Sequence, residues 1–425
     1  MELRIGFLIL RDTSLKTMGC LIDVCINHGY PTVLFYDDTA ISGSKAYQRI
    51  TPEKLNAFRN KGAILVNLNI SELANICNKA QVDVLVTHEG YYNLKDRLNE
   101  IVQLRRKGMR IVSLCHFFEI AGQPLDALTF FDKTYYPSEY ARDLHFQLKA
   151  PSHQVQQELS RYEGLHEVAG SPMFDQLANL DKKRFKKEIE IPDDQPIVLL
   201  FAPVLSRTTN WRYYVWREPD RKKRIASVVG DKKWRFLWEA AVGHSFFDIV
   251  KAIRAFCDKH GARLLIKSRL KQNDPAYLSE WADQYYDGRD DTYFPVFSTY
   301  KLISAADLCI GVMSMSVVEA VAMSKPTLNI YIPPSIEYPK EYTNISKGER
   351  AYLNAVMKKQ DGPLSRSDSM VILQRHQILP WFNDHETLDF EINEEAVREY
   401  KKRFLGITDI PSSTRIFNSL ITLGG

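Results

Sequence analysis

The sequence has no long hydrophobic run. Its longest apolar stretch, around Ile197 to Leu205, contains Pro203 and has about half of the ~18 to 20 residues that a membrane-spanning helix needs. The N-terminal segment MELRIGFLIL has one basic residue, no long apolar core and no small-residue cleavage site, so it predicts a first β-strand and not a signal peptide. These absences predict a cytoplasmic protein.

Patterns typical of metal sites and disulfides are also missing. The six cysteines are scattered singly without C-x2-C spacing, which argues against a zinc site, and most lie in apolar stretches where a thiol packs as a small hydrophobe. We therefore expect free thiols in a reducing compartment. No other feature of the sequence demands a bound metal, and no cofactor is expected. The cysteines are Cys20, Cys25, Cys77, Cys115, Cys257 and Cys309.

Neither sign of charge predominates. The 56 basic and 52 acidic residues give a net charge of +4, too balanced to indicate a nucleic-acid partner. Apolar residues make up 45% and charged residues 25% of the 425 positions, as in ordinary globular proteins. At ~150 residues per domain, the length predicts two or three domains.

The first half of the chain alternates short apolar runs with helical patterns. Such alternation is typical of βαβ units and predicts a parallel sheet, whose ligands bind at the carboxyl ends of the strands. We expect strands at Arg4–Leu10, Thr32–Tyr36, Ala63–Asn67, Val82–Thr87, Arg110–Cys115, Lys133–Tyr136 and His166–Ala169.

A charged segment, residues 182–195, contains Pro192, precedes Pro196 and predicts a domain boundary. A second alternating set follows it, so the chain repeats one architecture twice. Helices are expected at Ser245–His260, Ala276–Tyr285 and Ser316–Met323. Strands are expected at Ile197–Ala202, Leu264–Lys267, Thr292–Val296, Leu308–Val312 and Thr327–Tyr331.

The segment Met313-Ser314-Met315-Ser316 joins a buried strand to a helix. Two hydroxyls and the unpaired N–H groups of a helix N-terminus there favour a phosphate group. Lys267 and Arg269, which end the preceding strand, can supply positive charge to the same edge. In the alternative interpretation, Ser316 and Glu319 form an ordinary capping box and the basic residues are solvated.

The run ISAADLCIGVMSMSVVEAVAMSKPTLNI resembles the donor-binding segment of GT-B-fold enzymes, which have two facing Rossmann-like domains with parallel sheets and a C-terminal crossover helix. VAGSPMFDQL, LLFAPVLSR and DIPSSTRIFNSLITL are similar to other segments of the bacterial cell-surface branch: CMP-Kdo transferases, CDP-glycerol glycerophosphotransferases and UDP-GlcNAc 2-epimerases. Many members of that branch carry Lys-x-His-Pro where this chain has Lys267-Ser268-Arg269-Leu270, so no role of that histidine is transferred.

The resemblance implies three regions. Residues 1–180 would form the N-terminal acceptor domain. Residues 196–390 would form the nucleotide-sugar donor domain with an insertion at 206–240, and 391–425 would return as helices to the first domain. It also implies that Glu319 contacts the donor ribose.

Glycosyl transfer builds negative charge on a leaving phosphate and needs a base for the acceptor proton. Phosphate candidates are Arg207, Lys267, Arg269, Ser314 and Ser316. Glu89, in a His-Glu-Gly turn after a strand, resembles an acidic-Gly motif of sialic acid and Kdo transferases and is the expected base; a surface turn is the alternative. His116 is a rival after the next strand.

The insertion contains ten Lys or Arg residues and four acids, interleaved with aromatic residues. Long structured insertions often act as lids, and rings such as Trp211 and Tyr214 stack on sugars. In the alternative interpretation, the insertion is a solvated helix with its aromatic residues in the core. Asp231 within it is a second carboxylate candidate, as base or nucleophile. Arg11 and Ser14, after the first strand, are candidate acceptor contacts.

Together these features predict a metal-independent glycosyltransferase that uses a nucleotide sugar. A basic site favours an acid sugar such as CMP-Kdo as donor, and a cell-surface polysaccharide or lipopolysaccharide as the glycan or glycolipid acceptor. Peripheral association with the inner membrane face is a further expectation, and no nucleic-acid partner is expected. Two alternatives remain: a non-catalytic glycan- or nucleic-acid-binding module of the same fold, and a nucleotide-sugar 2-epimerase.

Overall fold

The computed structural model describes residues 3–37, 50–88, 94, 98–115, 131–149, 164–202, 246–268, 277–312, 314–330, 362–388 and 391–424. The chain divides into two compact units. Unit 1 comprises Met1–Asn179, Thr292–Phe297 and Glu399–Gly425, and unit 2 comprises Leu180–Asp291 and Ser298–Arg398. The chain therefore crosses between the units four times.

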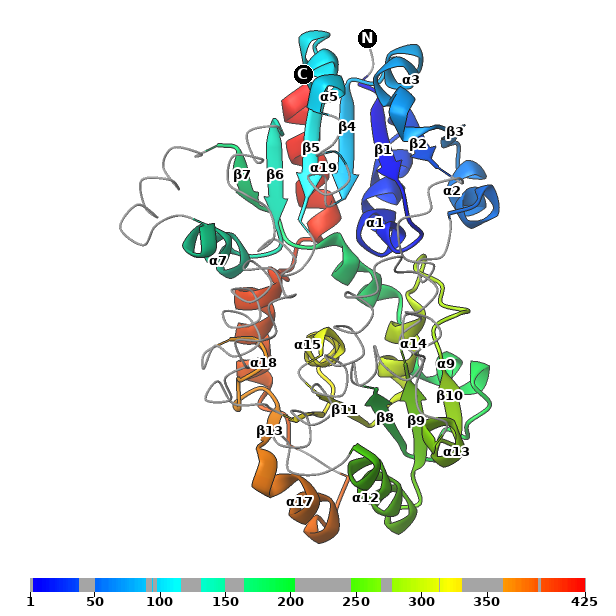
Figure 1. Ribbon diagram of the computed structural model, residues 1–425, viewed down its shortest axis with the longest axis vertical. Helices are drawn as coiled ribbons and strands as arrows, with labels where there is room; N and C mark the ends of the chain where they lie inside the picture. Colours follow the sequence, from blue (N-terminus) through cyan, green and yellow to red (C-terminus); the bar gives the residue numbers. More distant parts are fainter. Residues whose placement is uncertain are drawn as a thin grey trace, which may run out of the picture. The chain divides into compact units, whose positions relative to one another are not determined.

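Unit 1 is built on a seven-stranded sheet with the order β3-β2-β1-β4-β5-β6-β7 (Figure 1). Every pairing is parallel, as the alternating pattern predicted. The strands are β1 (Ile5–Ile9), β2 (Thr32–Tyr36), β3 (Ile64–Asn67), β4 (Val84–His88), β5 (Arg110–Leu114), β6 (Lys133–Tyr136) and β7 (His166–Val168). The connecting helices include α1 (Ser14–Asn27), α3 (Leu73–Lys79), α5 (Leu98–Arg106) and α7 (Glu139–Lys149).

Unit 2 has a six-stranded parallel sheet with the order β10-β9-β8-β11-β12-β13. Its strands are β8 (Ile197–Phe201), β9 (Arg263–Lys267), β10 (Gln284–Tyr286), β11 (Leu308–Val312), β12 (Thr327–Ile330) and β13 (Val371–Leu373). Its helices include α9 (Lys182–Glu188), α12 (Phe246–Lys259), α13 (Tyr277–Trp281), α14 (Ser298–Ala305), α15 (Met315–Ala322) and α17 (Ile378–Asp384). The helix predicted over Ala276–Tyr285 ends at Trp281, because the chain there enters β10.

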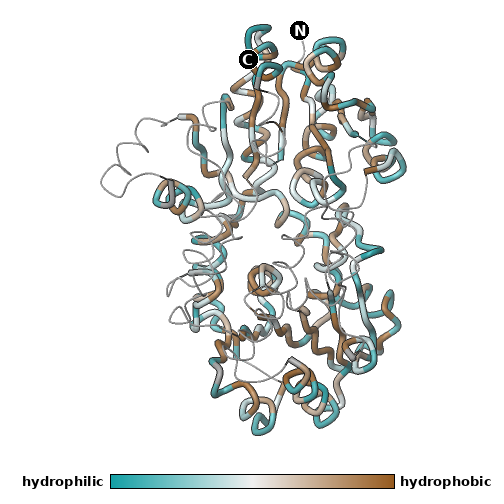
Figure 2. The backbone as a smooth tube through the Cα atoms, viewed as in Figure 1, coloured by the Kyte–Doolittle hydropathy of each residue, from teal (hydrophilic) through white to brown (hydrophobic). Residues whose placement is uncertain are grey.

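The cores of both units lie along the central strands. All residues of β1, β2, β4, β8 and β11 are buried, which explains their nearly continuous apolar sequences. Figure 2 shows the same distribution, with hydrophobic colour along the inner strands and hydrophilic colour on outer helix faces. No helix in the described part of the chain is long and apolar enough to cross a membrane.

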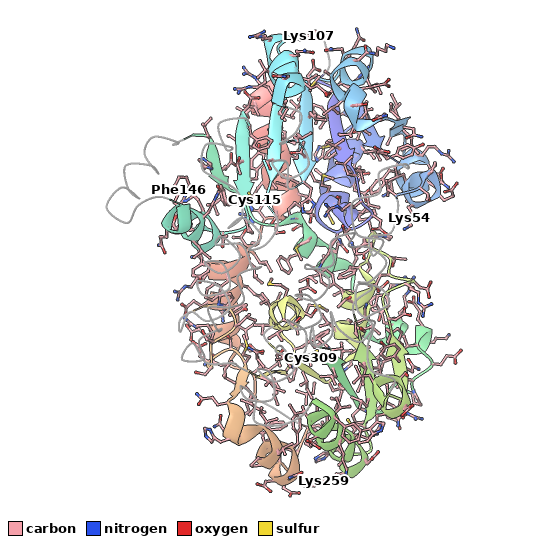
Figure 3. All side chains as sticks on the ribbon, viewed as in Figure 1. Lys54, Lys107, Cys115, Phe146, Lys259 and Cys309 are labelled. Atoms are coloured by element: carbon pink, nitrogen blue, oxygen red, sulfur yellow. The ribbon has the colours of Figure 1, made fainter. Side chains whose placement is uncertain are left out.

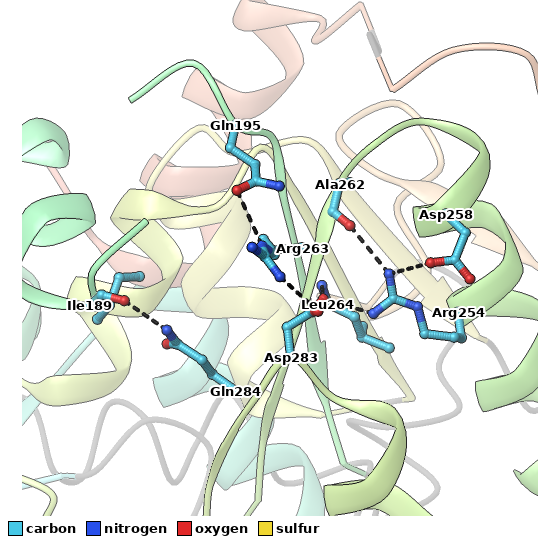
Figure 4. Close-up of polar contacts among 9 residues, drawn as sticks. All are labelled: Ile189, Gln195, Arg254, Asp258, Ala262, Arg263, Leu264, Asp283 and Gln284. Atoms are coloured by element: carbon cyan, nitrogen blue, oxygen red, sulfur yellow. Dashed lines mark hydrogen bonds and ion pairs between the residues drawn. The ribbon is translucent and has the colours of Figure 1, made fainter. Parts of the chain in front are cut away.

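An aspartate stands immediately before four of the strands and fixes their pairing. The Oδ2 atom of Asp283 accepts a hydrogen bond of 2.7 Å from the Leu264 amide, and the Asp283 amide donates one of 2.8 Å to the Leu264 carbonyl (Figure 4). Asp83, Asp132 and Asp307 make the same reciprocal pair with Arg4, Ile111 and Ile197 respectively. These bonds satisfy backbone groups at the amino ends of both sheets.

The C-terminal segment packs on unit 1. Helix α19 (Ser412–Gly424) begins where Asp175 accepts hydrogen bonds of 3.0 and 2.6 Å from the Ser412 and Ser413 amides. Its Phe417 ring stacks on His28, the C-cap residue of α1, at 4.6 Å between centroids. Helix α19 thus joins the core of unit 1, whereas the residues up to Arg398 belong to unit 2.

Residues Thr292–Phe297, here called the strap, belong to unit 1 although unit 2 surrounds them in sequence. The predicted strand over Thr292–Val296 is wrong, since the strap forms no β-pairing. Its Phe294 instead stacks on Phe58 at 4.7 Å and lies against Gly19, where a Cβ would come within 2.2 Å of the Phe294 ring. Packing of its aromatic side chains thus decides the conformation of the strap.

The backbone of the strap is tied down by one buried side chain. Gln176, which is fully buried, donates hydrogen bonds from Nε2 to the Lys16 carbonyl at 2.9 Å and the Tyr293 carbonyl at 3.2 Å. Its Oε1 accepts from the Phe297 amide at 2.8 Å. The strap is therefore an integral part of unit 1.

Candidate functional site

The carboxyl edge of the unit 2 sheet carries a buried lysine. Lys267 is the last residue of β9, and its side chain is only 7% exposed. Its Nζ donates hydrogen bonds of 2.9 Å to the Ser268 carbonyl and 2.9 Å to Oδ2 of Asp291, whose side chain is 13% exposed. A buried ammonium group needs such a partner, so Asp291 neutralises the charge in this structure.

Beside Lys267, the Ser268 side chain is 2% exposed. Its Oγ has no hydrogen-bond partner in the part of the chain that the structure describes, whereas its amide donates to the Tyr286 carbonyl at 2.7 Å. A buried hydroxyl without a partner is costly, so a ligand that supplied a partner would gain a hydrogen bond there.

Helix α15 begins at the same sheet edge, directly after β11. Ser314 is its N-cap, with Oγ accepting a hydrogen bond of 3.3 Å from the Ser316 amide. Ser316 therefore lies inside the first turn and does not cap the helix, so the alternative capping-box interpretation with Glu319 is wrong. The N-terminus of α15, the positive end of the helix dipole, still lies where β11 ends, a favourable place for an anion, although the Ser316 and Val317 amides already donate to Ser314.

The sheet order places these groups close along one edge. Strands β9 and β11 both flank β8, and all three run in parallel. Lys267 at the end of β9 and Ser314 after β11 therefore lie at the same edge of the sheet, two strands apart. Glu319, on the second turn of α15, is 5% exposed. The phosphate site predicted at Lys267, Ser314 and Ser316 is thus compatible with the geometry of unit 2.

The carboxyl edge of the unit 1 sheet has a different composition. Asp37 directly follows β2, Asp12 follows β1, and His88 ends β4; they are 4%, 1% and 6% exposed. Oδ2 of Asp12 accepts a hydrogen bond of 2.8 Å from Nζ of Lys54, which Figure 3 labels. Nε2 of His88 lies 3.4 Å from Oγ1 of Thr17.

Only some of the buried polar residues at the carboxyl edges of the two sheets could be found from the sequence. Asp12 and His88 lie in segments that follow predicted strands, but Asp37, Lys54 and Asp291 were missed. Asp37 carries a usable signal, since it comes directly after the apolar run Thr32–Tyr36. Lys54 and Asp291 carry none, because their partners are 42 and 24 residues away.

The two acceptor candidates of unit 1 lie at the start of α1. Arg11 is half-buried in the turn after β1, and Ser14 is the first residue of α1 and 4% exposed. The N-cap position belongs to Thr13, whose side chain makes no capping hydrogen bond. Both residues therefore stand near Asp12 at the unit 1 edge and remain candidate acceptor contacts.

Several predicted site residues lie outside the described part of the chain. They are the catalytic candidates Glu89, His116 and Asp231, the phosphate candidates Arg207 and Arg269, and the lid residues Trp211 and Tyr214. The whole insertion at 206–240 also lies outside. Their roles stay predictions.

The thiols are free in all six cysteines, and five of them are buried, including Cys115 and Cys309 (Figure 3). Burial raises the pKa of Cys25, Cys77, Cys257 and Cys309 to about 12, so these thiols stay protonated and act as packing groups. Within the described residues, no three His, Cys, Asp or Glu side chains gather as metal ligands.

Searches of protein-family models and of curated protein sequences found no match to this chain. Solved structures are similar in fold. A proposed UDP-N-acetylglucosamine 2-epimerase from Listeria monocytogenes aligns with 100% of this chain and 97% of its own, at 10% identity and a TM-score of 0.56. The wall teichoic acid polymerase TagF aligns with 100% of this chain and 89% of its own, at 9% identity and a TM-score of 0.55.

A UDP-GlcNAc 2-epimerase from Neisseria meningitidis, solved with UDP-GlcNAc bound, covers 99% of this chain and 100% of its own. Its identity is 11% and its TM-score 0.51. Coverage of both units at such low identity establishes the fold alone. The chain has the GT-B fold, with one Rossmann-like sheet in each unit and a C-terminal helix that returns to unit 1.

Proposed function

We propose that this protein is a glycosyltransferase that uses a nucleotide sugar and binds the nucleotide phosphate at the carboxyl edge of the unit 2 sheet. The observation that carries this proposal is the buried Lys267 at the end of β9, together with the N-terminus of α15 after β11. A buried ammonium group and the positive end of a helix dipole form an environment that stabilises phosphate oxygens.

The proposed reaction requires two chemically different groups. Negative charge grows on the leaving phosphate, and Lys267 with the first turn of α15 would stabilise it without a metal ion. A base must take the proton of the acceptor hydroxyl, and we assign this role to Glu89, directly after the last residue of β4. Arg207 and Arg269 would add positive charge at the phosphate, and Glu319 would contact the ribose.

For the substrates, we propose an acid sugar on CMP as donor and a cell-surface glycan or glycolipid as acceptor. The basic, aromatic insertion at 206–240 supports a large acceptor, because rings stack on sugars and cations hold anionic groups. Trp211 and Tyr214 would bind the acceptor from this insertion, and Arg11 and Ser14 from unit 1.

A thermal-shift panel of CMP, CDP, UDP and GDP tests the proposal. At 100 times its dissociation constant, a nucleotide adds ~2.7 kcal/mol of stability, which gives a clear rise in melting temperature. We expect at least one nucleotide to bind, and Lys267→Met to weaken it by about 10- to 100-fold, because a charge-assisted hydrogen bond is lost.

Lys301→Met is the matched control. Lys301 pairs with Glu188 at 3.0 Å and lies in α14, so its loss removes the same charge from unit 2 without touching the carboxyl edge. Binding should stay within about twofold of the parent. No shift with any of the four nucleotides would refute the proposal, and epimerisation of UDP-GlcNAc without an acceptor would indicate an epimerase instead.

A further inference from the structure

The Lys267–Asp291 ion pair has a special position in the chain. Asp291 is the last residue of this stretch of unit 2, and Thr292 is the first residue of the strap. The pair is mostly buried, with side chains 7% and 13% exposed, and its N–O distance is 2.9 Å. The carboxylate of Asp291 thus binds the same ammonium group that is proposed to bind the nucleotide phosphate.

The ammonium group of Lys267 has three N–H donors, and two of them already make hydrogen bonds. Its Nζ donates to the Ser268 carbonyl and to Asp291, so one N–H remains. A phosphate would gain this N–H and the Oγ of Ser268, which lacks a partner among the described residues. It would also come close to the negative charge of Asp291, which repels it.

We propose that Asp291 is an internal competitor of the nucleotide phosphate. It holds Lys267 when the site is empty, and the phosphate displaces it and takes hydrogen bonds from Lys267 and the Ser268 hydroxyl. This inference rests on the proposed function, and it adds Asp291 as a residue that tunes nucleotide affinity and Ser268 as a phosphate ligand.

Displacement of Asp291 has a consequence for the strap. Residues 293–297 are anchored in unit 1 by Gln176 and by the stacking of Phe294 on Phe58, whereas Asp291 anchors the chain on the unit 2 side. When phosphate takes Lys267, the ion pair of this second anchor is lost. Nucleotide binding is therefore expected to speed amide exchange in residues 288–292, with residues 293–297 little changed.

The experiment compares nucleotide affinity in five forms of the full chain by calorimetry, with whichever of CMP, CDP, UDP and GDP binds the parent most tightly. Asp291→Asn keeps the size of the side chain and removes the competing charge, so we expect a dissociation constant about fivefold lower. Asp290→Asn, the matched control at an exposed neighbouring carboxylate, should change it by less than about twofold. In Lys267→Met, adding Asp291→Asn should give no further tightening, because the shared partner is gone.

The results distinguish a failure of the Asp291 inference from a failure of the proposed function. Unchanged or weaker binding in Asp291→Asn, while the parent binds, overturns this inference and leaves the proposed function standing. No binding in the parent overturns both. If Asp291→Asn does not fold, Asp291→Ser is the second variant. Hydrogen exchange in the parent gives an independent readout: no increase in residues 288–292 on nucleotide addition would also overturn the release of Asp291.

Discussion

In unit 1 the carboxylate that precedes β4, Asp83, makes the same pair of hydrogen bonds with its neighbouring strand as Asp283 and Asp307 make in unit 2. The amino edges of the two sheets are therefore built alike. Their carboxyl edges are not. Unit 1 gathers Asp12, Asp37 and His88 there, whereas unit 2 places Lys267 and the N-terminus of α15 at that edge.

This contrast separates what the fold requires from what chemistry requires. The aspartates at the amino edges satisfy backbone groups, a need that every parallel strand shares. The carboxyl edges have no common requirement, so their side chains are free to differ. The carboxylates of unit 1 suit proton transfer and hydroxyl recognition, and Lys267 with the α15 N-terminus of unit 2 suits phosphate, which supports the division of roles proposed above. Each edge also holds one residue of the opposite charge, because Lys54 pairs with Asp12 and Asp291 pairs with Lys267.

The largest effect that tests this division is on turnover. In Glu89→Gln, transfer from the nucleotide sugar should fall by about 10²- to 10⁴-fold, because the acceptor proton loses its base. Nucleotide affinity should not change, since the proposed phosphate site lies in unit 2. Glu72→Gln, at an exposed position of unit 1, is the control and should transfer normally.

Rates of transfer are compared at saturating donor, and affinity by calorimetry. Normal turnover in Glu89→Gln would remove this residue from the mechanism. A loss of nucleotide binding together with turnover would contradict the division of roles between the two units, because unit 1 would then contribute to the phosphate site.

A smaller effect is expected at the amino edges, where the two units should respond in the same way but to different degrees. Asp283 accepts hydrogen bonds from the Leu264 amide, Arg254 and Arg263, whereas the side chain of Asp83 accepts one, from the Arg4 amide (Figure 4). Asp283→Ala should lower the free energy of unfolding of unit 2 by about 3 kcal/mol, and Asp83→Ala that of unit 1 by about 1 kcal/mol.

Hydrogen exchange under denaturant measures the free energy of unfolding of each unit separately. Burial tends to raise the pKa of Asp283, but the hydrogen bonds from Arg254 and the Leu264 amide lower it below 3.8. A lowered carboxyl pKa stabilises the folded state above pH 3.8, and this stabilisation is lost as the pH falls further. Equal losses in the two alanine variants would show that the arginines contribute nothing.

The regular parts of this fold were readable because each depends on local sequence. Buried parallel strands need nearly continuous apolar runs, and Val84–His88 and Leu308–Val312 have them. The strap was wrongly predicted as a strand because the prediction used local sequence alone. Thr292–Val296 has the composition of a strand, but its aromatic rings pack into the core of unit 1. Nothing in those residues specifies that distant partner.

The candidate site shows the same limit. Lys267, Ser314 and Ser316 were found because they follow predicted strands, where parallel sheets bind ligands. Ser316 was nevertheless misplaced as a possible cap, since Ser314 two residues earlier has the extended backbone that a cap needs. Asp291 was missed altogether, because its pairing with Lys267 depends on how the chain turns after β10.

The last expected effect concerns the acid sensitivity of the two units. His166, in β7 of unit 1, contacts the rings of Tyr136 and Phe146 at centroid distances of 5.4 and 5.1 Å. Burial, and then the charge of Arg142, lowers the pKa of His166 from 6.5 to about 4. Between these values the unfolded chain binds a proton that the folded chain does not, so stability falls as the pH is lowered.

We expect this residue alone to cost unit 1 about 2 kcal/mol between pH 7 and pH 4.5. His166→Gln should remove that part of the pH dependence, measured by hydrogen exchange or urea unfolding at several pH values. His376→Gln, at an exposed position of unit 2, is the control and should leave the slope of unit 1 unchanged. An identical slope in the parent and in His166→Gln would show that protonation of His166 is not linked to folding, and the difference in acid sensitivity between the units would need another source.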